Sequence, residues 1–170
     1  MIDTDRTRLR HWLEKDIQAL TELRNNVSVQ SKLLARVRGS SPEDTRLWLE
    51  HRSDNQKDLL LIIADKNTDS LLGYIVYTGV DVVDKVVSLG ICLSSEIQRK
   101  GIGTEVLLSS MEYLQRYWDT RKVILEVSSL NVTAIKCYEK AGFVYCGKYE
   151  KHKYIDGSYQ DVILMEKFLL

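Results

Sequence analysis

The sequence predicts an α/β fold of the α+β kind, with a mostly antiparallel central sheet of six or seven strands and about four helices. Three runs rich in β-branched and aromatic residues, at 58–65, 71–80 and 86–93, follow one another as in a meander. Helical and strand-like patterns then alternate from 101 to 151. Lastly, Asp156-Gly157 carries the residue types of a hairpin turn before a closing strand.

The segment before the meander predicts one strand and two helices. The strand covers about 7–12, and the segment 16–24 places its apolar residues on one helical stripe. The next helix covers about 41–52, because its first residues are a capping serine, a proline and two acidic residues. We expect this helix to bury Leu47 and Trp48.

The segment after the meander supplies two more helices and three strands. Residues 101–118 have helical spacing, and 122–129 form a strand-like run. The helix 131–142 begins at an asparagine, which caps helix N-termini, and stops at a glycine. The last two strands cover 143–151 and about 159–167, on either side of the predicted turn.

Composition indicates one globular domain over residues 1–170. Hydrophobic residues make up 44% and charged residues 28% of the chain, close to globular averages. Lys plus Arg and Asp plus Glu are 24 each, so the chain lacks the basic field of a nucleic-acid-binding protein. The charged start and the absence of a long apolar run predict neither export nor membrane insertion.

The cysteines and histidines do not predict a metal site. The three cysteines include no Cys-x-x-Cys pair, and the three histidines have no ligand at metal-binding spacing. This pattern favours a reduced, cytoplasmic setting. We expect Cys92 and Cys137 to behave as small core residues without a covalent role.

A glycine-rich segment, Gln98-Arg99-Lys100-Gly101-Ile102-Gly103, lies between a predicted strand and a predicted helix. Glycines there let backbone N–H groups approach an anion at the positive end of the helix. The segment is not a dinucleotide fingerprint, because Val106 occupies the third glycine position, and it is not a Walker loop. It therefore predicts a phosphate-binding turn of another kind.

A second motif lies downstream, where residues 131–143 follow the pattern Asn-x-x-Ala-x-x-x-Tyr-x-x-x-Gly-Phe. Together with the loop 98–103, this motif closely resembles the GNAT superfamily of acyl-CoA-dependent N-acetyltransferases. The order of strands and helices from 71 to 150 is also similar. The ending, 152–167, resembles the branch that contains ribosomal-protein, spermidine and amino-sugar acetyltransferases.

The resemblance implies acetyl-CoA as co-substrate and no metal. It also implies a sheet whose strands splay apart at the cofactor site, between the strands that end at Leu93 and Ser128. Backbone N–H groups of the loop would hold the pyrophosphate, and the strand before it would hold the pantetheine arm. The implied cofactor-binding residues are Ile91, Cys92, Leu93, Gln98, Arg99, Lys100, Gly101, Ile102, Gly103, Thr104 and Asn131.

The resemblance further implies two catalytic residues. Tyr138 stands where the family commonly has its general acid, which protonates the departing thiolate; a core-facing tyrosine is the alternative. Glu126 stands where some bacterial ribosomal-protein N-terminal acetyltransferases have a base. Water-mediated deprotonation and a merely paired strand glutamate remain the alternatives for Glu126. The backbone N–H group of Leu93 is our candidate for stabilising the oxyanion.

The acceptor site is expected near the two early helices, which usually wall it in this fold. Between residues 21 and 42, Arg24, Lys32, Arg36 and Arg38 stand against Glu22 alone. One interpretation is a solvated helix face. The other makes Lys32, Arg36 and Arg38 substrate-binding residues for an amine that also bears phosphate or carboxylate, such as a nucleotide-linked amino sugar.

The predicted function is direct transfer of an acetyl group from acetyl-CoA to a primary amine. A peptide N-terminus and a polyamine are the alternative acceptors, and a longer acyl donor stays open. Two other classes are a CoA-binding sensor without turnover, which Tyr138 disfavours, and a peptide-binding interaction domain. Neither nucleic acid nor a membrane is expected as a partner, and the resemblance leaves a homodimer open.

Overall fold

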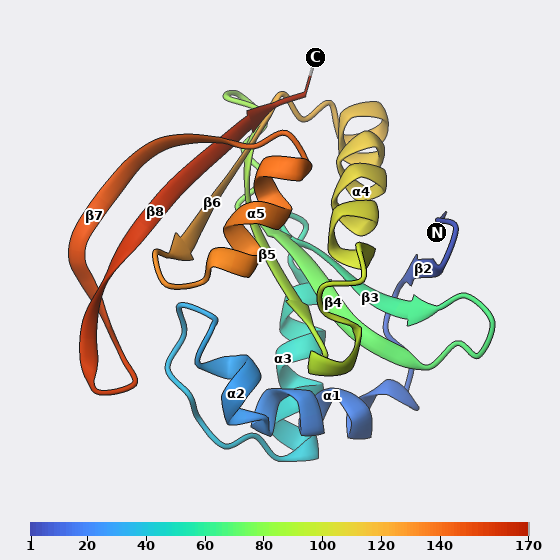
Figure 1. Cartoon of the computed structure of the whole chain (residues 1–170). Helices are drawn as coiled ribbons and strands as arrows, with labels where there is room; N and C mark the ends of the chain where they lie inside the picture. The colour runs from blue at the N-terminus through green and yellow to red at the C-terminus, as the bar shows by residue number, and fades with distance from the viewer. Residues whose placement is uncertain (170) are drawn as a thin grey trace.

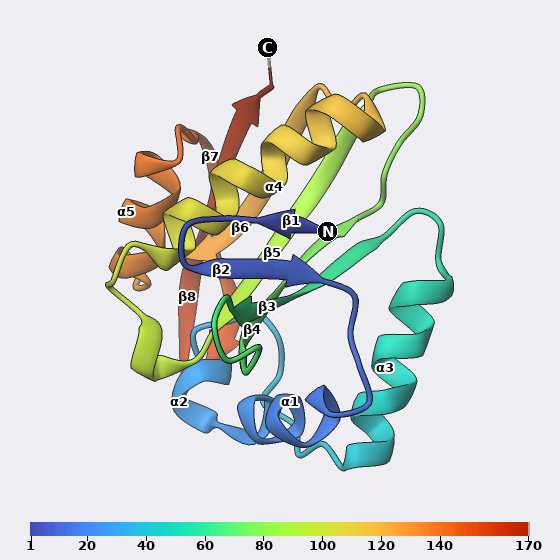
Figure 2. The same ribbon diagram turned by 90° about the vertical axis from the view of Figure 1, so that its right-hand side faces the viewer.

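The computed structural model describes residues 1–169, which form one eight-stranded sheet with helices on both of its faces (Figures 1 and 2). The strands are β1 Ile2–Asp3, β2 Thr7–Arg10, β3 Leu59–Asp65, β4 Leu71–Thr78, β5 Val86–Leu93, β6 Lys122–Ser128, β7 Val144–Ile155 and β8 Ser158–Phe168. The helices are α1 Asp16–Asn25, α2 Val27–Gln30, α3 Pro42–Asp54, α4 Ile102–Trp118 and α5 Val132–Lys140, with a short 3₁₀ turn at Ser95–Ile97.

The sheet is antiparallel except at one junction. Its strand order is β1-β2-β3-β4-β5-β6-β8-β7, and only β5 and β6 run parallel. These two strands pair over three residues, from Val86↔Lys122 to Ser88↔Ile124, and then diverge. The expected splay between the strands ending at Leu93 and Ser128 is therefore present.

Each face of the sheet carries its own apolar core. Helices α4 and α5 cover one face, and α1, α2 and α3 cover the other (Figure 2). Along β3, Leu59, Leu61 and Ile63 pack toward α4, whereas Leu60 and Ile62 pack toward α1 and α3. A strand buried on both faces needs apolar side chains at every position, which explains the unbroken apolar run of β3.

The predicted elements are confirmed, and two short ones were missed. Strand β1 adds an eighth strand, and α2 adds a fifth helix. Both are too short to show a periodic pattern, since β1 has two residues and α2 has four. Strand β7 also runs beyond the expected 143–151, to Ile155, where Asp156 and Gly157 both adopt the left-handed conformation of the predicted turn.

The expectation that α3 buries Leu47 is wrong. Leu47 is 54% exposed and Trp48 is half-buried, whereas Leu49 and Thr45 are buried. Thr45 and Leu49 lie one helical turn apart, and the Thr45 hydroxyl group is bonded to that of Thr21 on α1 at 2.9 Å. The buried stripe therefore includes a polar residue that apolar spacing does not reveal. The predicted Ser41 cap is present, as a capping box with Asp44.

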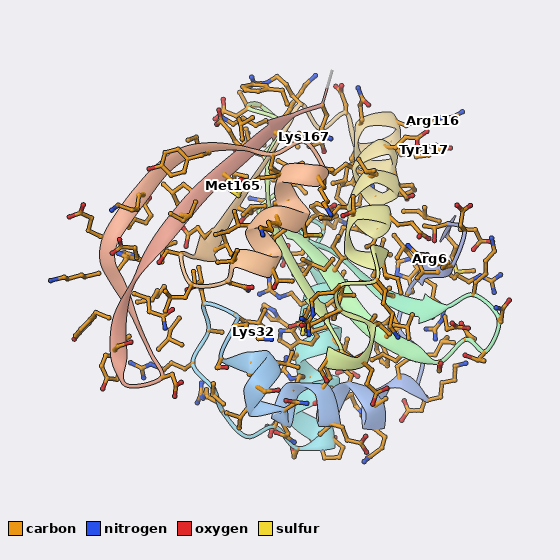
Figure 3. The ribbon with its side chains drawn as sticks, in the orientation of Figure 1. Arg6, Lys32, Arg116, Tyr117, Met165 and Lys167 are labelled. Carbon is orange, nitrogen blue, oxygen red and sulfur yellow. The ribbon has the colours of Figure 1, made fainter. Side chains whose placement is uncertain are left out.

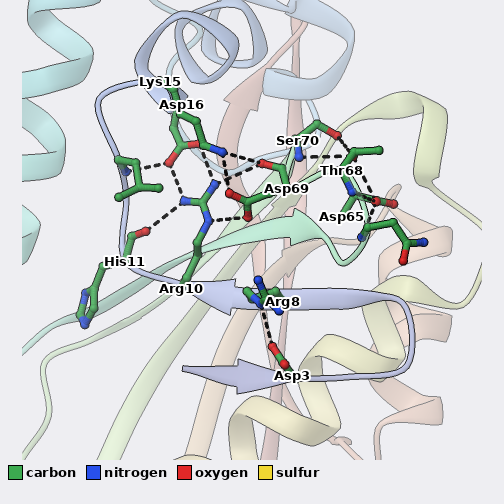
Figure 4. Close-up of polar contacts among 12 residues, drawn as sticks. Asp3, Arg8, Arg10, His11, Lys15, Asp16, Asp65, Thr68, Asp69 and Ser70 are labelled. Atoms are coloured by element: carbon green, nitrogen blue, oxygen red, sulfur yellow. Dashed lines mark hydrogen bonds and ion pairs between the residues drawn. The ribbon is translucent and has the colours of Figure 1, made fainter.

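A buried ion-pair network fixes α1 to the sheet (Figure 4). The Arg10 guanidinium group at the end of β2 donates to Asp16 at 2.7 and 3.0 Å and to Asp69 at 2.9 Å. Asp16 begins α1, and Asp69 lies in the turn between β3 and β4. Lys15 also donates to Asp69, so three separate segments meet at one cluster of charges.

No helix within residues 1–169 combines the length and the apolar character needed to cross a membrane.

Candidate active site

The glycine-rich loop ends at the beginning of α4, and the first backbone N–H groups of this helix have no capping side chain. Gly101 is the N-cap in the left-handed region, at φ 80°, and no side chain caps this helix. Arg99 is also left-handed, at φ 63°. The first N–H groups of a helix have no partner within the helix, so those of Ile102, Gly103 and Thr104 are free to meet an anion.

Gly103 also lets α4 and α5 approach each other closely. A Cβ atom at this position would lie 3.0 Å from Cys137 Sγ and 3.4 Å from Leu93 Cδ1. Cys137 belongs to α5 and Leu93 ends β5. The glycine therefore permits the loop to sit against both elements of the expected cofactor site.

Where β5 leaves β6, its edge exposes unpaired backbone groups. The N–H group of Ser94 donates to the Leu72 carbonyl group of β4, at 2.9 Å. Backbone groups alternate in direction along an antiparallel strand. The N–H groups of Ile91 and Leu93 therefore point away from β4, toward the opening between β5 and β6. This is the placement that a donor to the pantetheine arm or to a developing oxyanion requires.

A cavity of about 670 Å³ lies at this opening. On the α4 side of the sheet its lining includes the loop, Cys137 and Tyr138. On the α2 side the lining is mostly apolar and comprises Val29, Lys32, Leu33, Leu34, Ala35, Tyr74, Val76, Ser88, Gly90, Cys92 and Glu126. The cavity thus passes through the splayed sheet and can hold two reactants on its two sides.

Tyr138 projects from α5 to the cavity on the α4 side. The residue is 7% exposed and its ring packs edge-on against Phe143, with the centroids 5.8 Å apart. Burial, with Cys137 adding to the effect, raises the pKa of its hydroxyl group above the ordinary value. Because Tyr138 lines the cavity, its hydroxyl group can come within hydrogen-bond reach of a reactant bound there.

Glu126 lines the same cavity from β6 but on the opposite face of the sheet. Its neighbours in the strand, Leu125 and Val127, belong to the core under α4. Successive side chains of a strand point to opposite faces, so Glu126 lies on the α2 face, where it is exposed. Glu126 and Tyr138 therefore reach the opening from opposite sides.

Asn131 joins the beginning of α5 to the loop after α2. Its Oδ1 atom accepts from the Ala134 N–H group at 3.2 Å and so caps α5, as the sequence predicts. Its Nδ2 atom donates to the Lys32 carbonyl group at 3.3 Å. Figure 3 shows Lys32 on the loop after α2, near the beginning of α5. Asn131 thus connects the loop after α2 to the far wall of the cavity.

The structure brings most of the sequence-predicted residues to this cavity. The lining includes Ile91, Cys92, Leu93, Gln98, Arg99, Gly101, Gly103, Thr104, Glu126, Asn131, Tyr138 and Lys32. Four others lie outside it. Ile102 is buried in the core, and Lys100, Arg36 and Arg38 are exposed. Gln98 donates to the Leu93 carbonyl group at 3.0 Å, so its side chain holds the loop against β5.

Sequence reasoning missed two sets of lining residues. Lys136 and Lys140 add two cations from α5, one helical turn apart, and they lie within the recognised motif as its unspecified positions. The apolar wall of Val29, Leu33 and Leu34 was also missed, because the short α2 shows no helical period. Cys92 is buried, which raises the pKa of its thiol to about 12 and suits a packing role.

Comparison with known proteins identifies the family of the chain. The protein-family model described as an acetyltransferase (GNAT) domain matches residues 6–144. A spermidine N(1)-acetyltransferase of Vibrio cholerae is 27% identical over 159 residues, covering 91% of this chain and 90% of that protein. An N-alpha-acetyltransferase of Saccharolobus solfataricus is 28% identical over 124 residues, covering 67% of this chain and 69% of that protein.

Solved structures share the fold. The spermidine N-acetyltransferase from Vibrio cholerae in complex with CoA and spermine has a TM-score of 0.88 and 22% identity, with 95% of each chain covered. The RimL ribosomal L7/L12 alpha-N-protein acetyltransferase in complex with CoA also has a TM-score of 0.88, at 20% identity, covering 98% of this chain and 96% of that one.

Proposed function

Since the chain belongs to the GNAT acetyltransferase family and is thus an acetyl-CoA-dependent N-acetyltransferase, we propose that its acceptor is a primary amine whose other groups are neutral or anionic. A nucleotide-linked amino sugar is an acceptor of this kind. The charges on the α2 side of the cavity support the proposal. These charges bear on the acceptor class because charged groups must be compensated when a ligand leaves water.

The α2 side holds a single carboxylate and a single cation. Among the lining residues of the described chain, Glu126 is the one acidic residue and Lys32 is the cation beside the apolar wall of Val29, Leu33 and Leu34. A polyamine keeps further ammonium groups when one of its amines is neutral, and each favours a carboxylate partner. Glu126 alone does not provide these partners. A neutral or anionic body suits the apolar wall and Lys32 better.

The placement of the polar groups supports a direct transfer between two bound reactants. Glu126 on the α2 side is the proposed base that accepts the proton of the attacking amine. Tyr138 on the α4 side is the proposed acid that protonates the departing thiolate. Between them, the N–H group of Leu93 is directed at the opening, where it would stabilise negative charge on the carbonyl oxygen. The free amides of the loop and the cations Lys136 and Lys140 suit the phosphates of acetyl-CoA.

A polyamine is the second candidate acceptor, and the relatives favour it. Spermidine N(1)-acetyltransferases from two bacterial species are 25–27% identical over more than nine-tenths of this chain. An amine panel separates the candidates: a nucleotide-linked amino sugar, spermidine and a short peptide with a free N-terminus, each with acetyl-CoA and a thiol-release readout. We expect the highest kcat/KM for the amino sugar. Efficient acetylation of spermidine with an inert amino sugar would overturn the proposal.

Lys32 allows a sharper test, with Arg38 as its matched control. Both are exposed cations of the segment between α2 and α3, but only Lys32 lines the cavity. We expect Lys32→Gln to raise KM for a phosphate-bearing acceptor about fivefold, as the loss of one exposed charge interaction. Arg38→Gln should leave the KM for that acceptor unchanged. An equal effect of the two variants would mean that long-range charge, rather than contact at the cavity, determines acceptor affinity.

A further inference from the structure

The turn between β1 and β2 is attached to the first turn of α4. Glu105 Oε1 accepts from the backbone N–H group of Arg6 at 3.0 Å and from the Thr4 hydroxyl group. Glu105 Oε2 accepts from Arg6 Nε at 2.7 Å and pairs with Nη2 at 2.6 Å. Glu105 is thus fully engaged by the N-terminal turn, and Arg6 lies beside the beginning of α4 (Figure 3).

Arg6 makes one more contact, and it reaches the glycine-rich loop itself. Its Nη1 atom donates to the carbonyl oxygen of Lys100 at 2.6 Å. Lys100 stands between Arg99 and Gly101, the two left-handed residues of the loop. A left-handed residue that is not glycine costs about 1 to 2 kcal/mol, so this loop conformation depends on support from outside.

The contact with Lys100 also determines the direction of an amide. The Lys100 carbonyl group and the Gly101 N–H group belong to one trans peptide plane and point in opposite directions. Because Arg6 holds the carbonyl oxygen on its side, the Gly101 N–H group is directed away from Arg6. Gly101 lines the cavity, where the expected pyrophosphate site lies.

The Arg6 charge itself is compensated. The guanidinium group pairs with Glu105, whose side chain is 17% exposed. Burial acts to raise the pKa of Glu105, but hydrogen bonds from Thr4 and from the backbone and side chain of Arg6 outweigh it and leave that pKa below its usual value. The pair stays ionised and nearly neutral overall, so Arg6 acts on the loop through geometry rather than through attraction of anions.

We propose that Arg6 is a positioning residue, held by Glu105, that orients the Lys100–Gly101 peptide so that the loop can bind the diphosphate of acetyl-CoA. The proposal rests on the assignment of the loop 98–103 to the diphosphate. It adds Arg6, which lies near the N-terminus of the sequence and is not part of the loop motif.

The test compares two acetyl donors in the full-length enzyme. Acetyl-CoA carries the diphosphate, and acetyl-pantetheine carries the same thioester without it. For Arg6→Ala we expect KM for acetyl-CoA to rise about tenfold with kcat within about twofold, and kcat/KM for acetyl-pantetheine to stay unchanged. An equal loss with both donors would overturn the proposal, because it would indicate general damage. An unchanged KM for acetyl-CoA would overturn it as well.

Two further variants keep the comparison sound. Arg8→Ala is the matched control, because Arg8 lies in the same hairpin and pairs there with Asp3 at 2.9 Å (Figure 4). It should change neither donor's kinetics. Arg6→Lys retains the charge, but one ammonium group cannot serve Glu105 and Lys100 together, so we expect an intermediate KM even if Arg6→Ala fails to fold. Should Arg6→Lys match the wild type, the orienting role is refuted.

The wild-type enzyme tests the underlying assignment separately. If its kcat/KM is the same for acetyl-CoA and acetyl-pantetheine, the loop does not bind the diphosphate. The role proposed for Arg6 is then also wrong. If the wild type prefers acetyl-CoA and Arg6→Ala keeps that preference, only the role of Arg6 is wrong.

Discussion

Burial raises the pKa of the Tyr138 hydroxyl group above the ordinary tyrosine value, so this group is protonated at neutral pH. A phenol in this state can donate a proton but not accept one. The surroundings of Tyr138 therefore agree with the acid role that the sequence motif implies, and they disfavour a base role for the same residue.

Tyr138→Phe removes the proposed proton donor and leaves the ring that packs against Phe143. We expect kcat to fall about 100-fold, the usual effect of losing a general acid, with little change in KM for acetyl-CoA. Steady-state kinetics with the best acceptor measure both constants. Tyr145→Phe, at an exposed tyrosine of β7, serves as the control. Unchanged turnover in Tyr138→Phe would transfer the acid role to water.

For Glu126→Gln, the expected result is a pH-dependent loss. At low pH little of the amine is already neutral, so the absence of a base lowers the rate most there, and at high pH the loss becomes small. A pH profile of kcat/KM for the acceptor measures this. Glu139→Gln, an exposed residue of α5 that does not line the cavity, should follow the wild type. A loss in Glu126→Gln that is uniform across pH would point to structural damage instead.

At the scale of elements, the contact between β4 and β5 depends on one glycine. A Cβ atom at Gly73 would lie 2.1 Å from the carbonyl oxygen of Cys92 and 3.0 Å from Cα of Leu93. Both are backbone atoms, which cannot rotate away as a side chain does. The close pairing of these strands fixes the end of β5, where the N–H group of Leu93 faces the cavity.

We therefore expect Gly73→Ala to lower the free energy of unfolding by about 3 kcal/mol or more, measured by urea denaturation. Gly39→Ala is the control, because a Cβ atom at Gly39 meets nothing within 4 Å, and its effect should stay within about 0.5 kcal/mol. Equal stability of the two variants would contradict the close approach at Gly73.

The element scale also shows where the sequence is uninformative. Helices α4 and α5 could be predicted almost to their ends, because α4 has one apolar stripe and α5 has both a capping asparagine and a terminating glycine. In α3, three apolar residues stand side by side at 47–49, so spacing alone does not decide which of them is buried. The hairpin of β7 and β8 is exposed on much of both faces, and the far end of β7 therefore lacks an alternating pattern.

For the molecule as a whole, the cluster of Arg10, Lys15 and Asp69 links stability to pH. Hydrogen bonds from Lys15 and then Arg10 lower the pKa of Asp69 to about 2. A carboxyl group whose pKa is lower in the folded state contributes stability above its unfolded pKa of about 3.9. That contribution disappears as the pH falls through about 2.

The difference in unfolding free energy between the wild type and Asp69→Asn should accordingly be constant above about pH 5 and shrink between about pH 4 and 2. Chemical denaturation at a series of pH values measures it. A difference that is independent of pH down to about 2 would show that Asp69 does not gain its stability from ionisation.

From the sequence, the residues that line the cavity could be predicted better than the residues that support them from elsewhere in the chain. The loop 98–103 and the motif 131–143 are contiguous stretches, so their residues could be assigned to one site through the resemblance. Arg6 and Glu105 are far apart in the sequence, and their contact exists only after β1 and β2 have joined the sheet. Arg36 and Arg38 belong to a basic segment, but charge alone does not tell which cations face the cavity.

The short pairing of β5 with β6 has a mechanical consequence. The strands β1 to β5 form one part of the sheet, and β6, β8 and β7 form the other. The two parts are joined by the three-residue pairing of β5 with β6, a seam beyond which the edge of β5 has no partner strand. An amide-bearing pantetheine arm along that edge would serve as a substitute strand and stiffen the molecule across the seam. Hydrogen exchange at the amides of Ile91 and Leu93 should then slow on CoA binding, while that of β3 stays as it is. While it is bound, acetyl-CoA would thus act as part of the sheet. The sheet would become less rigid in every catalytic cycle, when CoA dissociates.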